Sequence, residues 1–236
     1  ILNISIFADV VVDVLPIAKK QSTNLYFKKG ENLNITVTGK WTLWYRYNLV
    51  GPEGHPDATT DYGNWGLLLG KIGGGETFVV GSSKNLTSDA DGVLYLFPNK
   101  GKFLIEKESG SLKASISGGQ NVNDLIKSFP PNTKKITYNP KNGILNTNLY
   151  FSENENIEIF AFGIWNMWDN YYKDTNAEGH MFEGFRPENI LWGKLFGGIG
   201  STYGYFFQKF AIGEKNTIQT SQAGILSLFP YTGNYE

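Results

Sequence analysis

The chain has 236 residues, a formal net charge of −1 at pH 7 and no cysteine. The missing cysteine excludes disulfides and cysteine-ligated metal sites, and the near-zero charge gives no electrostatic footprint for nucleic acid or an anionic membrane. No run of about 18 apolar residues occurs, so no membrane-spanning helix is predicted.

Short strands are predicted along most of the chain, because apolar residues alternate with polar ones or form brief runs bounded by Gly, Asn or Pro. The predicted strands cover residues 2–6, 10–12, 34–38, 77–80, 93–97, 112–116, 155–160 and 205–207. The best helix candidate is 123–127, just before Pro130 and Pro131. This pattern predicts an all-β chain of two antiparallel sandwiches.

A run of about a hundred residues occurs twice, which predicts two copies of one module. Leu25-Tyr26-Phe27 returns as Leu149-Tyr150-Phe151, and Glu53-Gly54-His55 returns as Glu178-Gly179-His180. The predicted organisation is a closing strand within residues 1–9, a first module over 10–117, a linker over 118–133 and a second module over 134–236 that lacks its last strand.

The segment 2–6 resembles the strand that closes the first module. Leu2-Asn3-Ile4-Ser5-Ile6 has the same alternation as Leu112-Lys113-Ala114-Ser115-Ile116. An incomplete sandwich exposes a hydrophobic strand edge, which favours aggregation. We therefore expect segment 2–6 to complete the second module, either in its own chain or in a neighbouring copy. The alternative is that further copies of the module flank this sequence.

Several motifs resemble those of one lectin family. They are Gly39-Lys40-Trp41, His55-Pro56-Asp57, the glycine-rich strand ending Lys71-Ile72-Gly73, and the closing hairpin with Ser109-Gly110-Ser111. Their order and spacing are similar to the PA-IL (LecA)-like, calcium-dependent galactose-binding lectins. The resemblance covers most of 10–116 and, more weakly, 134–236. It implies two tandem, divergent, jelly-roll-like β-sandwiches of the PA-IL-like or galactose-binding-like type.

The resemblance also implies a calcium ion, held by an Asp and two Asn side chains on the closing hairpin and by backbone carbonyls, one of them from Trp44. The Asp position is Lys100, and the Asn pair falls on Lys107 and Glu108. In the second module the Asp position is Thr232. Calcium requires oxygen ligands, and lysine supplies positive charge instead. We therefore predict no calcium, no other metal and no cofactor.

The candidate carbohydrate-binding residues lie at equivalent places in the two modules. They are Trp44, His55 and Asp57 in the first module and Trp168, His180 and Glu183 in the second. Each histidine could contact a sugar hydroxyl or could anchor its own turn through ring-nitrogen hydrogen bonds. The tryptophans, with nearby tyrosines such as Tyr45 and Tyr47, could stack on a sugar ring or form a hydrophobic lid over the sandwich.

Catalytic motifs are not found in the sequence. No Ser-His-Asp arrangement or nucleophile elbow occurs. The residue equivalent to Asp57 in the second module is Phe182, so the two modules share no pair of carboxylates of the kind a glycosidase needs. The glycine runs 73–75 and 197–200 lack the Lys-Ser/Thr of a phosphate loop and are interpreted as turns at strand ends. The chain is therefore predicted not to be an enzyme.

The sequence predicts a non-enzymatic carbohydrate-recognition module of a larger bacterial protein, which is secreted, on the cell surface or virulence-associated. The alternative is a structural, assembly or protein-interaction module on a lectin fold that has lost sugar binding. A glycan or glycoprotein is the expected ligand, and a protein partner or self-assembly is also expected. Neither nucleic acid nor a membrane span is expected.

Overall fold

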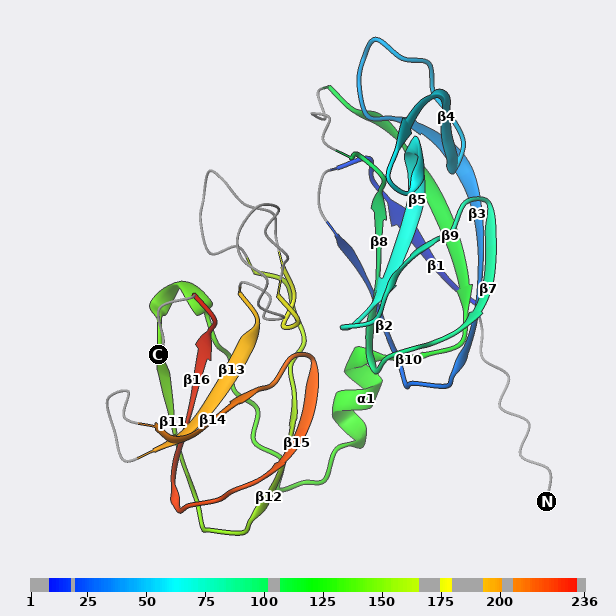
Figure 1. Cartoon of the computed structure of the whole chain (residues 1–236). Helices are drawn as coiled ribbons and strands as arrows, with labels where there is room; N and C mark the ends of the chain where they lie inside the picture. The colour runs from blue at the N-terminus through cyan, green and yellow to red at the C-terminus, as the bar shows by residue number, and fades with distance from the viewer. Residues whose placement is uncertain are drawn as a thin grey trace, which may run out of the picture. The chain divides into compact units, whose positions relative to one another are not determined.

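The computed structural model describes residues 9–17, 20–101, 107–165, 175–179, 193–200 and 206–232. All ladders between the described strands are antiparallel, so the chain is an all-β protein, as predicted. It divides into two compact units, unit 1 over Ile1–Ser128 and unit 2 over Phe129–Glu236 (Figure 1). No helix among the described residues is long and apolar enough to cross a membrane.

Unit 1 is a sandwich of two sheets. Its elements are β1 Val10–Val14, β2 Gln21–Phe27, β3 Asn32–Thr42, β4 Glu53–Thr60, β5 Gly63–Ile72, β6 Thr77–Val79, β7 Ser83–Thr87, β8 Gly92–Pro98, β9 Ser109–Ser117, β10 Gln120–Asn121 and α1 Val122–Ser128. One sheet has the order β1-β9-β3-β7, and the other has β10-β2-β8-β5-β4, with β6 also paired to β5. Strands of both sheets supply one hydrophobic core.

The alternation of β3 explains its place in the sandwich. Leu33, Ile35 and Val37 are buried in the core, whereas Asn34 and Thr36 are exposed. By contrast, β8 is almost continuously buried, since it lies between β2 and β5 in the middle of its sheet. The predicted strands at 34–38 and 93–97 are thus confirmed. The first alternates between apolar and polar residues, as a half-buried strand does, and the second is a nearly continuous apolar run, as a central strand is.

The predicted helix at 123–127 is confirmed as part of α1. Residues 118–133, expected to form a linker, contain both β10 and α1. β10 pairs with β2, and Val122 and Leu125 of α1 are buried. Residues 118–128 therefore belong to unit 1, and the division between the units falls after Ser128.

Unit 2 has fewer described strands. They are β11 Leu145–Phe151, β12 Asn156–Phe160, β13 Leu195–Gly200, β14 Phe206–Ala211, β15 Lys215–Gln219 and β16 Gly224–Pro230, preceded by a 3-10 turn at Pro140–Asn142. One sheet has the order β11-β16-β13-β14, and β12 and β15 form a two-stranded sheet. Residues from both sheets contribute to a second core.

Individual hydrogen bonds recur at equivalent places in the two units. The Thr23 hydroxyl donates to the Leu94 carbonyl at 2.9 Å, and the Thr147 hydroxyl donates to the Leu226 carbonyl at 2.6 Å. The next residue is Asn24 in one unit and Asn148 in the other, with φ of 59° and 58°. In both units the register of the strand pair shifts at this point, β2 against β8 and β11 against β16.

The glycine run 197–200 is not a turn at a strand end, as the sequence had suggested, because it lies inside β13. Gly197 lies against the ring of Phe210 and Gly198 against the ring of Phe206, so that a Cβ at either position would collide with an aromatic ring. These glycines therefore make room for neighbouring side chains. The run 73–75 does follow a strand end, between β5 and β6. The predicted strand 2–6 lies outside the described residues.

Candidate functional site

The loop after β3 and the β4–β5 hairpin bring aromatic side chains together at one end of unit 1. This group, the aromatic cluster, consists of Trp44, Tyr45, Tyr47, His55 and Trp65. The Tyr47 ring centroid lies 4.9 Å from that of His55, 5.3 Å from Trp65 and 5.6 Å from Trp44. Trp44 and Tyr45 meet edge to face at 6.1 Å, which is a favoured aromatic geometry.

Backbone hydrogen bonds hold the cluster in place. The β3–β4 loop closes where Trp41 and Val50 exchange N–H···O bonds of 2.9 and 2.8 Å. His55 on β4 lies directly opposite Trp65 on β5 in the sheet. The Trp41 indole donates to the Gly66 carbonyl at 2.9 Å, which ties the end of β3 to β5. Rigid strands therefore carry His55 and Trp65, and a closed loop carries the other three residues.

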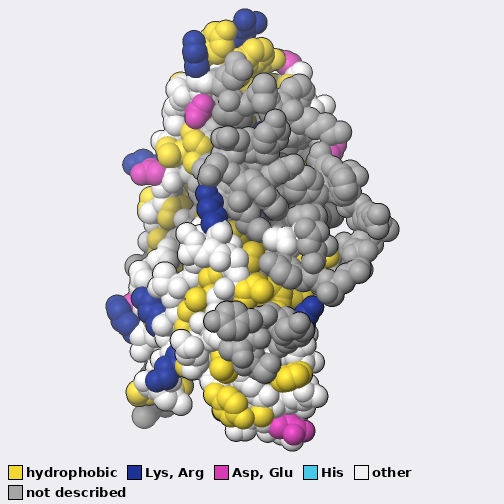
Figure 2. Space-filling model, turned by 90° about the vertical axis from the view of Figure 1, so that its left-hand side faces the viewer, with side chains coloured by type: hydrophobic (Ala, Val, Ile, Leu, Met, Phe, Trp, Pro, Cys, Tyr) yellow, Lys and Arg dark blue, Asp and Glu magenta, His cyan; other side chains and the backbone are white. Residues whose placement is uncertain are grey.

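Two cations adjoin the exposed part of the cluster. The Arg46 guanidinium lies 5.1 Å from the Trp44 ring centroid and 5.5 Å from that of Tyr45, and its Nε donates to the Tyr45 hydroxyl at 3.0 Å. The Lys107 ammonium lies 5.0 Å from the Tyr45 ring centroid. Tyr45 itself is 50% exposed. At the upper end of the space-filling view, in unit 1, hydrophobic side chains lie beside Lys and Arg (Figure 2).

His55 is buried within the cluster. Burial lowers its pKa, because desolvation disfavours the charged imidazolium, and the nearby Asp57 carboxylate partly opposes this effect. Its Nε2 is buried and has no hydrogen-bond partner among the described residues. Within the part of the chain that the structure describes, this nitrogen does not anchor the turn. It is a polar atom whose partner a ligand or a water could supply.

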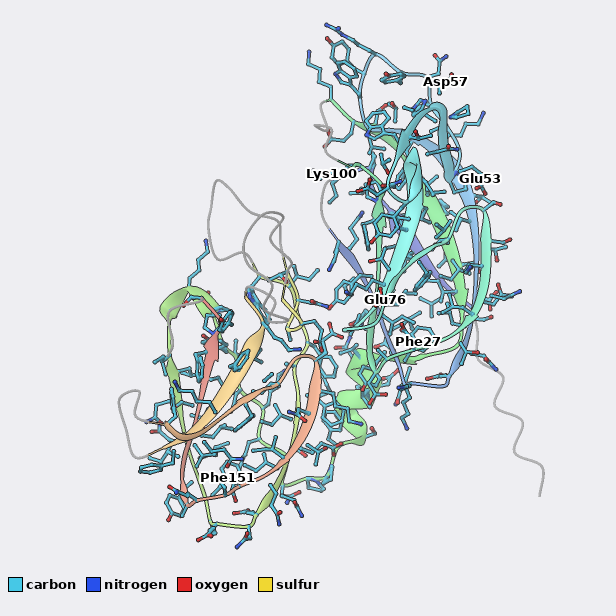
Figure 3. All side chains as sticks on the ribbon, in the orientation of Figure 1. Phe27, Glu53, Asp57, Glu76, Lys100 and Phe151 are labelled. Carbon is cyan, nitrogen blue, oxygen red and sulfur yellow. The ribbon has the colours of Figure 1, made fainter. Side chains whose placement is uncertain are left out.

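Asp57 lies where β4 departs from regular pairing. The register between β4 and β5 shifts between His55 and Thr59, so Pro56 and Asp57 lie in the bulged part of the strand. The Asp57 side chain is exposed (Figure 3). The His55-Pro56-Asp57 motif is thus part of a strand. The strand tolerates Pro56 because β4 is at the edge of its sheet, where no neighbour needs the missing N–H.

No protein-family model and no curated protein matches the sequence. Among solved structures, the chain is similar to one described as "EclA N-terminal domain; PllA-like lectin". The similarity has 23% identity and a TM-score of 0.38, and it covers 47% of this chain and 94% of that one. A likeness of this size carries no argument here. The all-β fold follows from the strand ladders of this chain, and the candidate site follows from its own residues.

The residues at the expected calcium positions do not fit a calcium ion. Lys107 and Glu108 are exposed, and the Lys107 ammonium is directed to the Tyr45 ring. Lys100 follows β8 (Figure 3). The Trp44 carbonyl, expected to bind calcium, accepts a hydrogen bond of 2.8 Å from the Thr42 hydroxyl. Among the described residues no group of three His, Asp or Glu side chains could hold a metal.

The second predicted site is only partly described. Trp168, His180 and Glu183 lie outside the described residues, whereas Thr232 is described and half-buried. The neighbouring Trp165 exchanges N–H···O bonds of 2.8 Å with Thr175, as Trp41 does with Val50 in unit 1. The local frame around this position therefore has the same hydrogen bonds in both units.

Two members of the site were not found from the sequence. Trp65 is a core residue, 3% exposed, but its ring also lies 5.4 Å from that of His55. Arg46 was not singled out, although it contacts both Trp44 and Tyr45. Its place between two tyrosines in a loop is a signal that could have indicated a cationic, aromatic surface.

Proposed function

We propose that the chain is a non-enzymatic carbohydrate-recognition module, built from two divergent copies of one lectin-like sandwich. A glycan binds at the aromatic cluster of unit 1, without calcium. The observation that supports this most is the half-exposed Tyr45 ring, flanked by Trp44, Arg46 and Lys107 within 6.1 Å. Exposed aromatic rings bind the apolar faces of sugars, and nearby polar groups bind the hydroxyls.

The cations favour an acidic sugar. Arg46 and Lys107 bring two positive charges to the Tyr45 ring, and no described carboxylate forms an ion pair with either of them. A guanidinium can form a bidentate pair with a carboxylate or sulfate group. We therefore propose that unit 1 prefers glycans with a uronate, sialate or sulfate over neutral ones.

A glycan array of neutral and acidic sugars, probed with the full chain with and without EDTA, tests the proposal. We expect binding to acidic glycans that EDTA does not change and that weakens with added salt. Tyr45→Ala should abolish it. Tyr150→Ala is the matched control, since Tyr150 is also exposed, at 67%, but lies in unit 2. Binding that EDTA removes, or that survives Tyr45→Ala, would contradict the proposal.

A role in assembly or protein interaction is the second candidate. The observation that favours it is in unit 2, where Tyr150 is 67% exposed although its counterpart Tyr26 is 2% exposed. Absence of binding to any glycan, together with a stable oligomer, would favour this role over sugar recognition.

A further inference from the structure

The two cations beside the aromatic cluster contact Tyr45 at different places. The Arg46 guanidinium lies at the phenol hydroxyl, to which its Nε donates at 3.0 Å, and it also lies over the Trp44 ring. The Lys107 ammonium lies over the Tyr45 ring itself. In Figure 2, Lys or Arg side chains flank the hydrophobic side chains at this end of unit 1 on more than one side. Arg46 and Lys107 therefore offer two separate positive charges.

Most of the hydrogen-bond donors around Tyr45 are unused. A guanidinium has five N–H groups, and among the described residues only the Nε–H of Arg46 has a partner. The three N–H groups of the Lys107 ammonium have none among these residues, although the ammonium contacts the Tyr45 ring. The Tyr45 hydroxyl accepts from Arg46, so its own O–H is free to donate to a ligand. Carboxylate and sulfate oxygens, which only accept, match such a set of donors.

Lys107 has an unusual backbone conformation for its residue type. Its φ is 49°, and the other described non-glycine residues with positive φ are Asn24, Asn148 and Asn154. Asparagine adopts this conformation readily, whereas lysine adopts it at a steric cost. Backbone strain of this kind occurs most often at sites that bind a ligand. The strained residue of unit 1 is thus the one that brings an ammonium to Tyr45.

The contacts with Tyr45 limit the separation of the two charges. The Arg46 Cζ lies 5.5 Å and the Lys107 Nζ 5.0 Å from the Tyr45 ring centroid, so these two atoms are at most 10.5 Å apart. Two positive charges this close repel each other, and two bound anionic groups would remove that repulsion. Acidic groups on neighbouring sugars of a glycan have separations of this order. A glycan with one acidic group would neutralise only one of the cations.

We propose that the site of unit 1 recognises two acidic groups at once, sulfates or carboxylates on neighbouring sugars of one glycan. Arg46 binds one group through its planar fork, and Lys107 binds the other as a point charge. Lys107 is then the residue that distinguishes glycans with two acidic groups from those with one. This inference rests on the proposed function, because it concerns the same site, and it specifies the charge pattern of the ligand.

Three forms of one disaccharide test the inference: unsulfated lactose, lactose with a single sulfate, and lactose with one sulfate on each sugar. Titration calorimetry with the full chain gives the Kd of each form. We expect the doubly sulfated form to bind at least about fivefold more tightly than the singly sulfated one. Its affinity should also fall more steeply with added salt, since two charge pairs are screened instead of one.

Lys107→Asn is the decisive variant, because it removes the ammonium and asparagine tolerates the positive φ. It should weaken binding of the doubly sulfated form about fivefold and leave the singly sulfated form unchanged. Arg46→Lys keeps the charge but loses the planar fork, so it should weaken binding of both. Lys28→Asn is the matched control, since Lys28 is also exposed but lies between β2 and β3, at the far end of β3 from Trp44.

Three results would overturn this inference and leave the proposed function in place. They are equal Kd values for the singly and doubly sulfated forms, a Lys107→Asn variant that weakens binding of both forms equally, and a Lys107→Asn variant that weakens neither. Circular dichroism of the variant shows that it is folded. Failure of all three forms to bind would overturn the inference as well, and the glycan array would then show whether the proposed function fails with it.

Discussion

The carboxylate of Glu53 accepts a hydrogen bond of 2.6 Å from the backbone N–H of Ser82, and this bond ties the start of β4 to the turn that follows β6. In unit 2, Glu178 accepts the equivalent bond of 2.7 Å from Glu214. The residue before each donor is a glycine with positive φ, Gly81 at 59° and Gly213 at 65°. The same acid and the same turn thus occur in both units.

Removing these carboxylate charges should destabilise the two units unequally. The Glu178 side chain is 13% exposed and also pairs with Lys194 at 3.0 Å, whereas Glu53 is exposed. We expect Glu178→Gln to lower the free energy of unfolding by about 2 kcal/mol and Glu53→Gln by less than about 1 kcal/mol. Urea unfolding followed by tryptophan fluorescence measures both, with Glu153→Gln at an exposed position as control. Equal losses for the two variants would contradict the view that burial and the ion pair with Lys194 make Glu178 more important for stability than Glu53.

The stability of unit 1 should depend on pH through His55. Its pKa in the folded chain is below the ordinary value of about 6.5, so between these two values the unfolded chain binds more protons. The free energy of unfolding is therefore at its full value above about pH 6.5 and falls as the pH falls through this window. His55→Gln should flatten this part of the curve in urea unfolding series across it. Identical slopes for the variant and the wild type would exclude His55 as the source.

Periodicity predicted the strands but not every feature around them. The alternation of Leu33, Ile35 and Val37 is enough to place β3, because one face must be buried. The strand β4 was missed, since Pro56 reads as a loop residue and only the sheet order reveals an edge. Gly197 was misread for a related reason: the ring of Phe210, distant in sequence, decides its role.

For the candidate site, the sequence indicated Trp44 and His55 but not the contacts that bring them together. The two residues are brought together by the loop that Trp41 and Val50 close and by the pairing of His55 with Trp65. Neither contact is encoded by local spacing. The Nε2 of His55 is buried and has no hydrogen-bond partner in the described part of the chain, and this too follows from packing by Tyr47 and Trp65, which no single-sequence pattern reports.

Calcium should leave the thermal stability unchanged. An ion that binds only the folded chain stabilises it by RT ln(1 + [ion]/Kd), and a concentration of about 10 mM is well above the Kd of about 0.1–1 mM of extracellular calcium modules. With Lys107 directed to Tyr45 and the Trp44 carbonyl bonded to Thr42, we expect no shift between millimolar calcium and EDTA. Differential scanning fluorimetry measures it, with magnesium as control. A rise in Tm specific to calcium would contradict this account of the closing hairpin.

Asn99 should be the most costly polar residue to remove near the site. It is 3% exposed, its Nδ2 donates to the Asn64 carbonyl at 3.0 Å, and its Oδ1 accepts from the Thr60 hydroxyl at 2.7 Å. Asn99→Ala would leave these groups at the tip of the β4–β5 hairpin without their partner. We expect a loss of about 2–3 kcal/mol, since unsatisfied buried groups carry their desolvation cost.

Thr60→Val separates the contributions of the two hydrogen bonds of Asn99. It removes the bond to the Asn99 Oδ1 and leaves the bond from the Asn99 Nδ2 to the Asn64 carbonyl in place. It should cost less than Asn99→Ala, and the double variant should cost less than the sum of the two, since the residues share one interaction. Urea unfolding gives the three values. Amide exchange across β4 should quicken in the same order, because the hairpin that positions His55 depends on this contact. Strict additivity would mean that the Thr60–Asn99 bond contributes nothing to the stability of the hairpin.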